Sequence, residues 1–404
     1  MVPQLVAVRE IQGLYGPVRL SERLLQLIWR RRDYSEKRLR SLDGRPVRVI
    51  RPGSWNHREG PDFLDAIVEI GGKRVRGDVE IHFRSRNWRE HDHHLDPAFS
   101  SVVLHVVLFP PREDECPAIT QRGFHPPTCS MLEALEIGLE EYAEQEAVRL
   151  LCDDDKEFCE TYSLLLPDER QDHLKQYARK RWDAKVTWAA KRLEATSWAE
   201  SCHQFFLEVM GYHRNRAVMG TIALEHPLSA LTRNLPDPDE LFQSRADEWK
   251  LAGLRPANHP RVRLRQYLEI VACRADWPDL VLGWLHALRS GGEMEETSSF
   301  RKKREMSLKG KELSEHIIGG VIGSGRFNTW MADGLLPLAA AKMNQDLFGW
   351  WFHWYAGNAP DQVTAILREL GVIGKFSATL CNGWVQGALG AVTALSLRGE
   401  QVED

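Results

Sequence analysis

Carboxylate and imidazole side chains gather in one segment, GPDFLDAIVEIGGKRVRGDVEIH, which runs from Gly60 to His82. Its apolar pattern predicts two strands joined at a glycine turn. Because side chains alternate between the faces of a strand, Glu80 and His82 share one face and lie about 6.6 Å apart along it. Carboxylate oxygens suit hard cations such as Mg²⁺, and an imidazole can transfer a proton. The segment therefore predicts a metal-dependent catalytic site.

The length of the glycine turn decides whether Asp62 belongs to this site. With a two-residue turn at Gly71-Gly72, Asp62 lies opposite Ile81 and falls on the other face of the hairpin. With a three-residue turn, Asp62 lies opposite His82 and shares its face. An irregular Gly60-Pro61 lead-in could also direct Asp62 inward without a change of register. The sequence is compatible with each of these arrangements.

Histidines continue beyond the hairpin, in WREHDHHLD and in the apolar run SVVLHVVLF. His91, His93 and Asp96 have the side chains of a Zn²⁺ or Mn²⁺ site, although such a run in a loop is more often solvent-facing than metal-binding. His105 interrupts an apolar strand, where it is either a buried neutral histidine or a metal ligand beside Asp62 and Glu80. The candidates for orienting the site, which could equally be turn or packing residues, are Asn56, Trp88 and Asp96.

The elements that would position these residues change character along the chain. A helix with arginines in its last turn is expected over residues 21–32, followed by a short strand in RPVRVIRPG, the hairpin and the strand at 101–109. This order predicts a mixed sheet with flanking helices over residues 1–127. From about Thr128 the apolar period becomes 3.6, which predicts a mainly helical domain over 128–404 with a mobile polar loop at about 290–313. The expected class is α+β.

A basic helix in the second half is the candidate surface for nucleic acid. The segment DHLKQYARKRWDAKVTWAAKRLEATSW is rich in lysine and arginine, which can neutralise a phosphate backbone without reading its sequence. A solvated helix face is the alternative interpretation. The residues expected to contact phosphates are Lys175, Arg179, Lys180, Lys185 and Arg192.

The composition narrows the class of protein. The formal net charge of −4 disfavours a protein covered by nucleic acid, so such binding would use a local basic patch. Seven cysteines without a CxxC pair favour a reducing cytoplasm over a disulfide framework or a zinc ribbon. No apolar stretch is long enough to predict a membrane span, and the first residues lack the pattern of a signal peptide. A cytoplasmic protein is expected.

The motifs PGSWNHREGPDF, GDVEIHF and NWREHDHHLDPAFSSVVLHVV resemble an uncharacterised bacterial family known as DUF 2851. The resemblance extends more weakly through GYHRNRAVM and RPANHPRVRLRQ to CNGWVQGALG, so it covers most of the chain. The family name implies no activity.

A second resemblance carries an expected chemistry. The order of helix, strand, strand after Pro-Asp, strand with Glu-x-His and further strand is similar to the core of the PD-(D/E)xK nucleases. The resemblance implies that Asp62 and Glu80 bind Mg²⁺ or Mn²⁺ and that Glu22 is the helical acid of the site. His82 stands where the superfamily has lysine, and histidine is not a permanent point charge.

These observations lead to three hypotheses about function. The first is a metal-dependent nuclease or phosphodiesterase with Asp62, Glu80 and His82 as catalytic residues. The second, favoured by the histidine in place of lysine, is a non-catalytic binding or scaffold protein that keeps a nuclease-like fold. The third is a His/Asp metallohydrolase that acts on a small molecule and uses zinc.

Overall fold

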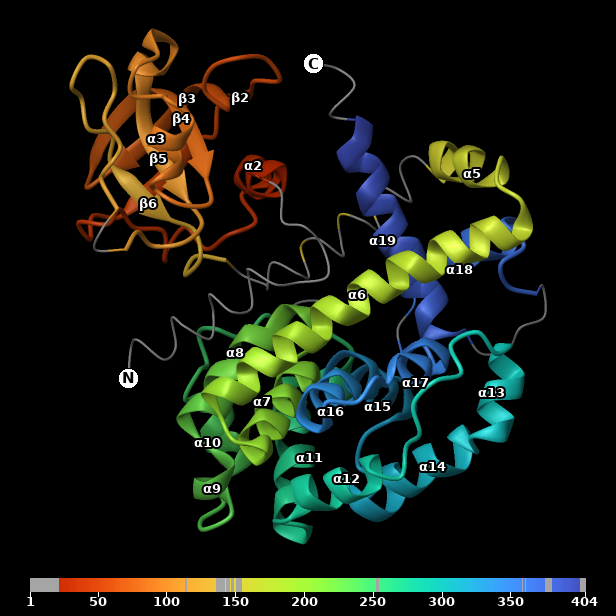
Figure 1. The fold of residues 1–404 in the computed structure, drawn as a ribbon. Coiled ribbons are helices and arrows are strands. Elements are labelled where there is room, and N and C mark those ends of the chain that lie inside the picture. Colours follow the sequence, from red (N-terminus) through yellow and green to blue (C-terminus); the bar gives the residue numbers. More distant parts are fainter. Residues whose placement is uncertain are drawn as a thin grey trace. The chain divides into compact units, whose positions relative to one another are not determined.

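The computed structural model describes residues 22–112, 115–135, 142, 146, 149, 155–251, 254–357, 359, 361–374 and 380–399. The chain forms two compact units, Leu20–Glu136 and a second made of Met1–Arg19 with Ile137–Asp404 (Figure 1). The first unit holds a mixed sheet, and the described part of the second is mainly helical. The α+β prediction is confirmed. The unit boundary lies after residue 127 because Thr128–Ser130 is still a strand of the sheet.

The sheet of the first unit follows the order β1-β3-β4-β5-β6, with β2 paired to β3. The neighbours β1, β3 and β4 run antiparallel, whereas β4, β5 and β6 are parallel. The chain between β4 and β5 forms the crossover that parallel pairing requires. The elements of this unit are α2 (Glu22–Arg31), β1 (Val47–Arg51), β2 (Ser54–Trp55), β3 (Phe63–Ile70), β4 (Lys73–His82), α3 (Asn87–Glu90), the 3₁₀ helix η1 (Pro97–Ser101), β5 (Val102–Val107) and β6 (Thr128–Ser130).

The hairpin of β3 and β4 has a two-residue turn and a bulge. Ile70 pairs with Lys73 across Gly71-Gly72, whose φ angles of 57° and 81° suit glycine. The register then shifts by one residue between Phe63 and Ala66, where Asp65 has a φ of 60°. Beyond this bulge Phe63 pairs with Val79, so the next residue, Asp62, lies opposite Glu80.

This bulge corrects the expectation that a two-residue turn would place Asp62 on the wrong face. Turn length alone sets the register only in an uninterrupted hairpin, and one extra residue in β3 reverses the face on which Asp62 lies. The bulge is supported from β4, since Asp78 Oδ1 accepts a hydrogen bond from the Asp65 amide at 2.9 Å.

The second unit is built around the long helix α6 (Pro167–Ala195), which packs against α16 and α19 (Figure 1). The buried side chains of α6 include Leu174, Trp182 and Trp188. Close approach to α19 requires small residues there, because a Cβ on Gly387 would lie 2.4 Å from the Leu174 carbonyl oxygen. The basic helix predicted over residues 172–198 lies mostly within α6.

The remaining elements of this unit are helices of varied length. They are α5 (Asp155–Ser163), α7 (Trp198–Met210), α8 (Tyr212–Glu225), α9 (Leu228–Leu231), α10 (Pro238–Gln243), η2 (Pro256–Asn258), α11 (Pro260–Cys273), α12 (Trp277–Leu285), α13 (Thr297–Lys303), α14 (Met306–Glu312), the π-helix η3 (Leu313–Ile317), α15 (Ser324–Trp330), the π-helix η4 (Met331–Leu335), α16 (Leu336–Met343), α17 (Phe348–His353), α18 (Asp361–Glu369) and α19 (Asn382–Gly399). None of the helices in the described ranges is long and apolar enough to cross a membrane.

Residues 290–313, expected as a mobile polar loop, contain α13 and α14. Phe300 and Met306 are completely buried and anchor the two short helices. Arg301 donates hydrogen bonds to the backbone oxygens of His353, Trp354 and Leu380. The polar residues of this segment therefore cover a few deeply buried apolar side chains, a pattern that composition alone does not distinguish from a linker.

Two expectations fall partly on residues whose structure is not described. The absence of a signal peptide concerns the chain start, and residues 1–21 lie outside the described ranges. The mainly helical domain expected from residue 128 also lies partly outside them, residues 136–141 included, and its first residues, Thr128–Ser130, form β6.

Candidate metal centre

Asp62 and Glu80 lie side by side at the end of the β3–β4 hairpin. The Asp62 amide donates to Glu80 Oε2 at 3.0 Å, and Asp62 Oδ2 accepts from the Ile81 amide at 2.9 Å. Glu80 is only 5% exposed. The backbone of each strand thus holds the carboxylate of the other, which fixes both acids without a basic side chain between them.

Two imidazoles approach the Oε1 oxygen of Glu80, and a third lies close to both of them. Oε1 of Glu80 lies 3.3 Å from His82 Nε2 and 3.2 Å from His93 Nε2, and neither nitrogen makes a hydrogen bond among the described residues. Ligand atoms of His82, His91 and His93 all lie within 4.8 Å of one another. A cation placed among these atoms would meet one carboxylate oxygen and up to three imidazole nitrogens, which is a donor set suited to Zn²⁺ or Mn²⁺.

His105 is linked to the site through His82, by a contact between the two imidazole rings. Its Nε2 lies 3.0 Å from His82 Nδ1, and the His105 side chain is completely buried. When His82 Nδ1 donates to His105, the Nε2 of His82 keeps its lone pair and points toward Glu80. His105, expected as a metal ligand beside Asp62 and Glu80, is therefore placed to fix the orientation and tautomer of a ligand. His105 Nδ1 makes no hydrogen bond within the described part of the chain.

Burial dominates the electrostatics of this cluster. It raises the pKa of Asp62 to about 8, with the neighbouring Glu80 and Glu22 charges adding to the effect. It also raises the pKa of Glu80 to about 8, although the Asp62 amide opposes the shift. Burial lowers the pKa of His93 to about 4 and that of His105 to about 3, and holds the pKa of His82 far below its usual range.

These shifts describe a site that lacks positive charge. The imidazoles of His82, His93 and His105 are neutral near pH 7, which is the metal-binding form of histidine, so the contacts from His82 and His93 to Glu80 are not ion pairs. Buried carboxylates without a cation gain protons instead of keeping their charge. A divalent ion would stabilise the ionised carboxylates and the neutral imidazoles together.

Helix α2 contributes two polar side chains, Glu22 and Gln26, one turn apart. Glu22 Oε1 accepts from the Phe83 amide at 3.4 Å, and burial raises the pKa of Glu22 while His91 lowers it. Gln26 Nε2 donates to Asp62 Oδ1 at 2.6 Å, and Gln26 Oε1 accepts from Trp55 Nε1 at 3.1 Å. The expected helical acid is therefore close to the site.

Gln26 is a site residue that the sequence reasoning missed. Its spacing of four residues from Glu22 places both on one helix face, and this was the available signal. His91 and His93 were expected as supporting residues of the site, but the direct contact of His93 Nε2 with Glu80 Oε1 at 3.2 Å was not expected.

The three candidate orienting residues have distinct positions. Asn56 binds the Glu59 and Pro61 carbonyls through Nδ2, and its amide donates to the Asp62 carbonyl at 2.8 Å, so it shapes the lead-in to β3. Trp88 is completely buried and packs edge-on against His82, His93 and His105. Asp96 is exposed and caps η1 by accepting from the Ala98 amide.

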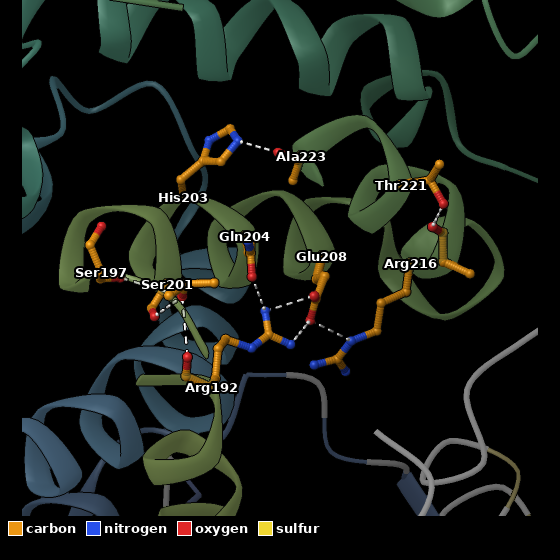
Figure 2. Close-up of polar contacts among 11 residues, drawn as sticks. Arg192, Ser197, Ser201, His203, Gln204, Glu208, Arg216, Thr221 and Ala223 are labelled. Carbon is orange, nitrogen blue, oxygen red and sulfur yellow. Dashed lines mark hydrogen bonds and ion pairs between the residues drawn. The ribbon is translucent and has the colours of Figure 1, made fainter. Parts of the chain in front are cut away.

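The basic positions of α6 do not form one free cationic face. Arg192 is 5% exposed and makes a two-pronged ion pair with Glu208, at 2.8 and 3.2 Å (Figure 2). Lys185 is 9% exposed and pairs with Asp333 at 3.1 Å. Both were expected to contact phosphates, and the structure contradicts this role because these buried side chains serve internal ion pairs.

The other basic residues of α6 lie nearer to solvent. Arg179 pairs with Asp183 and Asp346, Lys175 lies over the Trp384 ring, and Lys180 is exposed. Lys175, Arg179 and Lys180 therefore remain candidate phosphate contacts on α6.

Comparison with known proteins agrees with the motifs of the first unit. The profile of a family described as "Protein of unknown function (DUF2851)" matches residues 22–243, which is more than half of the chain and includes every residue of the metal cluster. Neither the curated proteins nor the solved structures contain a match to this sequence. The chain belongs to the DUF2851 family of proteins of unknown function.

Proposed function

We propose that this protein is a metal-dependent hydrolase that cleaves phosphodiester bonds, with the metal ion held by Glu80, His82, His91 and His93. The observation that carries the proposal is the convergence of His82 Nε2 and His93 Nε2 on Glu80 Oε1, at 3.3 and 3.2 Å, without a hydrogen bond. Lone pairs that approach so closely repel one another unless a proton or a cation lies between them. Three imidazoles and a carboxylate favour Mn²⁺ or Zn²⁺ over Mg²⁺.

The residues around this set have separate roles in the proposed reaction. A bound metal ion would supply Lewis-acid activation of the attacking water and of the phosphoryl group. Asp62, fixed by Gln26 and the Ile81 amide, orients the Glu80 carboxylate through its own amide. Glu22, with its raised pKa, is the carboxylate available to take a proton from the water. His82 is then a ligand, whereas the sequence suggested a proton-transfer role.

The substrate class rests on topology and on the PD-(D/E)xK resemblance. The order α2, β1, β3, β4, β5 brings Asp62, Glu80 and Glu22 together, as the resemblance implies. Nucleic acid is the proposed substrate, and a cytoplasmic location is part of the same proposal. The three imidazoles also favour a second candidate, a metallohydrolase that acts on a small molecule, since the resembling nucleases use lysine where this chain has His82.

Metal binding is the first test. We expect the purified chain to bind Mn²⁺ or Zn²⁺ in calorimetry, and Glu80→Gln to weaken binding by at least about tenfold, because the charged ligand is lost. Glu59→Gln changes an exposed acid of the same unit and serves as the control. If wild-type protein binds no divalent metal while folded, the scaffold interpretation replaces the enzyme.

Cleavage is the second test and separates the two enzymatic candidates. We expect cleavage of single- or double-stranded DNA or RNA, or of bis(p-nitrophenyl) phosphate, with Mn²⁺ present and none with a chelator. Glu80→Gln should lose this activity, and Glu59→Gln should retain it. Metal binding without cleavage of any phosphodiester would favour the small-molecule metallohydrolase.

A further inference from the structure

A cationic segment lies next to the metal cluster in the sequence. Residues 23–58 hold eleven lysines and arginines and three acids, whereas the whole chain has a formal net charge of −4. The segment begins in α2, directly after Glu22, and ends in the loop after β2, four residues before Asp62. Three acids do not neutralise eleven cations, so the segment itself has a net positive charge.

Two arginines of this segment lie over one aromatic ring. Arg23 and Arg30 are exposed, and their spacing of seven residues places them on one face of α2, about 10.5 Å apart along its axis. Their guanidinium carbons lie 5.7 and 5.3 Å from the centre of the Trp55 ring. A cation is attracted to the face of a ring, whereas the N–H groups of a guanidinium lie in its own plane. The contact with Trp55 therefore leaves donors for a further acceptor.

The Trp55 ring has a fixed position between α2 and β3. Phe63, which is completely buried, stacks on it with the ring centres 6.2 Å apart, and the exposed His57 ring lies 4.7 Å away. Trp29 of α2 donates through Nε1 to the Pro52 carbonyl at 3.1 Å, which joins the helix to the chain before β2. The ring that holds the two arginines is thus ordered by the fold itself.

One glutamine links this ring to the metal cluster. Gln26 lies between the two arginines on the same helix face. Its Oε1 accepts from Trp55 Nε1 at 3.1 Å, and its Nε2 donates to Asp62 Oδ1 at 2.6 Å. In the sheet, Trp55 pairs with Phe63, the residue after Asp62. The cationic surface is therefore a neighbour of the acids of the proposed metal centre.

The arrangement suits a polymer of phosphates better than a single phosphate group. The two arginines start two helical turns apart, within a segment that carries further positive charge. A nucleic acid presents a phosphate at every nucleotide and can contact several cations at once. Such contacts position the polymer without reading its sequence, and surfaces that bind nucleic acid commonly combine cations with aromatic rings.

We propose that Arg23, Arg30 and Trp55 form a surface that binds the phosphate backbone of nucleic acid and places a phosphodiester beside the metal cluster. Both arginines donate to phosphate oxygens, and Trp55 orients their guanidinium groups. The placing of a phosphodiester rests on the proposed function, whereas the binding of nucleic acid requires no metal. The surface belongs to the sheet unit, whereas the sequence suggested phosphate contacts on α6.

Fluorescence anisotropy on the full chain tests the proposal, with a labelled oligonucleotide offered single-stranded and as a duplex. A chelator is present throughout, and affinity is measured over a series of salt concentrations. We expect saturable binding of at least one form, which weakens as salt rises. Arg30→Gln should lower the affinity at low salt by about tenfold and reduce the slope of log affinity against log salt by about 1, because one phosphate contact is lost.

Two matched variants separate this surface from general effects of charge. Arg74→Gln removes an exposed arginine at the other end of β4, about 20 Å along the strand from Glu80, and should bind as wild type does. Trp55→Leu should weaken binding in a folded variant, and Trp55→Phe should restore most of it, because a ring face holds the arginines. Polyglutamate at the same charge concentration should bind much more weakly than the oligonucleotide.

The outcomes distinguish this proposal from the proposed function. Glu80→Gln should keep its affinity for the oligonucleotide, so a failure of metal binding or of cleavage leaves the surface intact. The surface is overturned if neither form of the oligonucleotide binds, or if polyglutamate binds as tightly. It is also overturned if folded Arg30→Gln binds as wild type does, or if Arg74→Gln loses as much affinity, even where cleavage is observed.

Discussion

At the scale of single residues, the metal cluster is distinguished by buried carboxylates and imidazoles without a basic side chain beside Glu80 among the described residues. Glu80 has backbone and imidazole neighbours but no arginine or lysine in contact with it among the described residues, and its pKa is raised by burial. His82 keeps one nitrogen for His105 and leaves the other facing Glu80. Buried carboxylates and imidazoles without a basic partner contribute little to the stability of the fold. They contribute more when a bound cation lies between them.

The raised carboxylate pKa values predict a pH dependence of stability in the metal-free protein. Between pH 6.5 and 8 the unfolded chain has released the protons of Asp62 and Glu80, while the folded chain still holds them. The folded state binds more protons, so the free energy of unfolding falls as pH rises. Each carboxyl group that stays protonated in the folded state contributes a loss of about 2 kcal/mol between pH 6.5 and 8. The lowered histidine pKa values act below pH 6.5, where stability falls as pH decreases.

Hydrogen exchange of the β4 amides in chelator-treated protein, corrected for intrinsic rates, measures this dependence. Glu80→Gln, which cannot ionise, should show a smaller loss between pH 6.5 and 8. Saturating Mn²⁺ should remove the loss, because metal binding requires the deprotonated carboxylate. If the β4 amides of the metal-free protein became better protected from exchange between pH 6.5 and 8, the raised pKa values of Asp62 and Glu80 would be contradicted.

His105 provides a second prediction at this scale. His105→Phe keeps an aromatic ring in the core but removes the partner of His82 Nδ1. Loss of such a supporting hydrogen bond should weaken Mn²⁺ binding about 10- to 100-fold. Calorimetry measures the effect, and His57→Phe at an exposed position is the control. Unchanged affinity in a folded variant would show that His82 binds the metal equally well without its hydrogen bond to His105.

At the scale of elements, the bulge of β3 is the feature that creates the site. Asp65 adopts a left-handed φ, its amide bonds to Asp78 Oδ1, and Asp78 Oδ2 accepts from Ser101 Oγ. The bulge is thus tied to both its partner strand and the crossover. Without it, the two-residue turn would direct Asp62 away from Glu80.

Asp78→Ala removes the acceptor that holds the bulge. We expect a loss of about 1 kcal/mol in stability and weaker Mn²⁺ binding, because Asp62 and Glu80 no longer have a fixed register. Asp78→Asn keeps an acceptor oxygen and should remain close to wild type in both. Urea denaturation and calorimetry give the two readouts. Equal metal affinity in the alanine and asparagine variants would mean that the bulge persists without Asp78.

At the scale of the whole molecule, the sheet unit has its own core and its own candidate site. Leu25 and Trp29 of α2, Val79 of β4 and Leu104 of β5 are all buried. Each residue of the metal cluster comes from this unit. We therefore expect a fragment of residues 20–136 to fold alone and to bind Mn²⁺ with an affinity close to that of the full chain.

Circular dichroism and calorimetry on that fragment check the expectation. An unfolded fragment would show that the sheet depends on residues of the helical unit. A folded fragment that binds no metal, when the full chain does, would show that the helical unit supplies a ligand.

The sequence by itself determined the residue types, the hairpin and the shared face of Glu80 and His82, because strand periodicity is local. It also predicted the α+β class, the order of the first strands and the helices over α6 and α11, since these depend on apolar spacing. It did not distinguish a linker from the short helices at 290–313, where a few buried side chains such as Phe300 are decisive.

Only the tertiary structure decided which residues meet. Asp62 joins Glu80 through a bulge whose single extra residue leaves no clear trace in the apolar pattern. His91 and His93 join them because the crossover between two parallel strands returns over the sheet, and His105 contacts His82 because β5 pairs with β4. Lys185 and Arg192 became internal because α6 is packed against other helices on several sides. Contacts between residues far apart in the chain depend on packing and long-range pairing, which local periodicity does not encode.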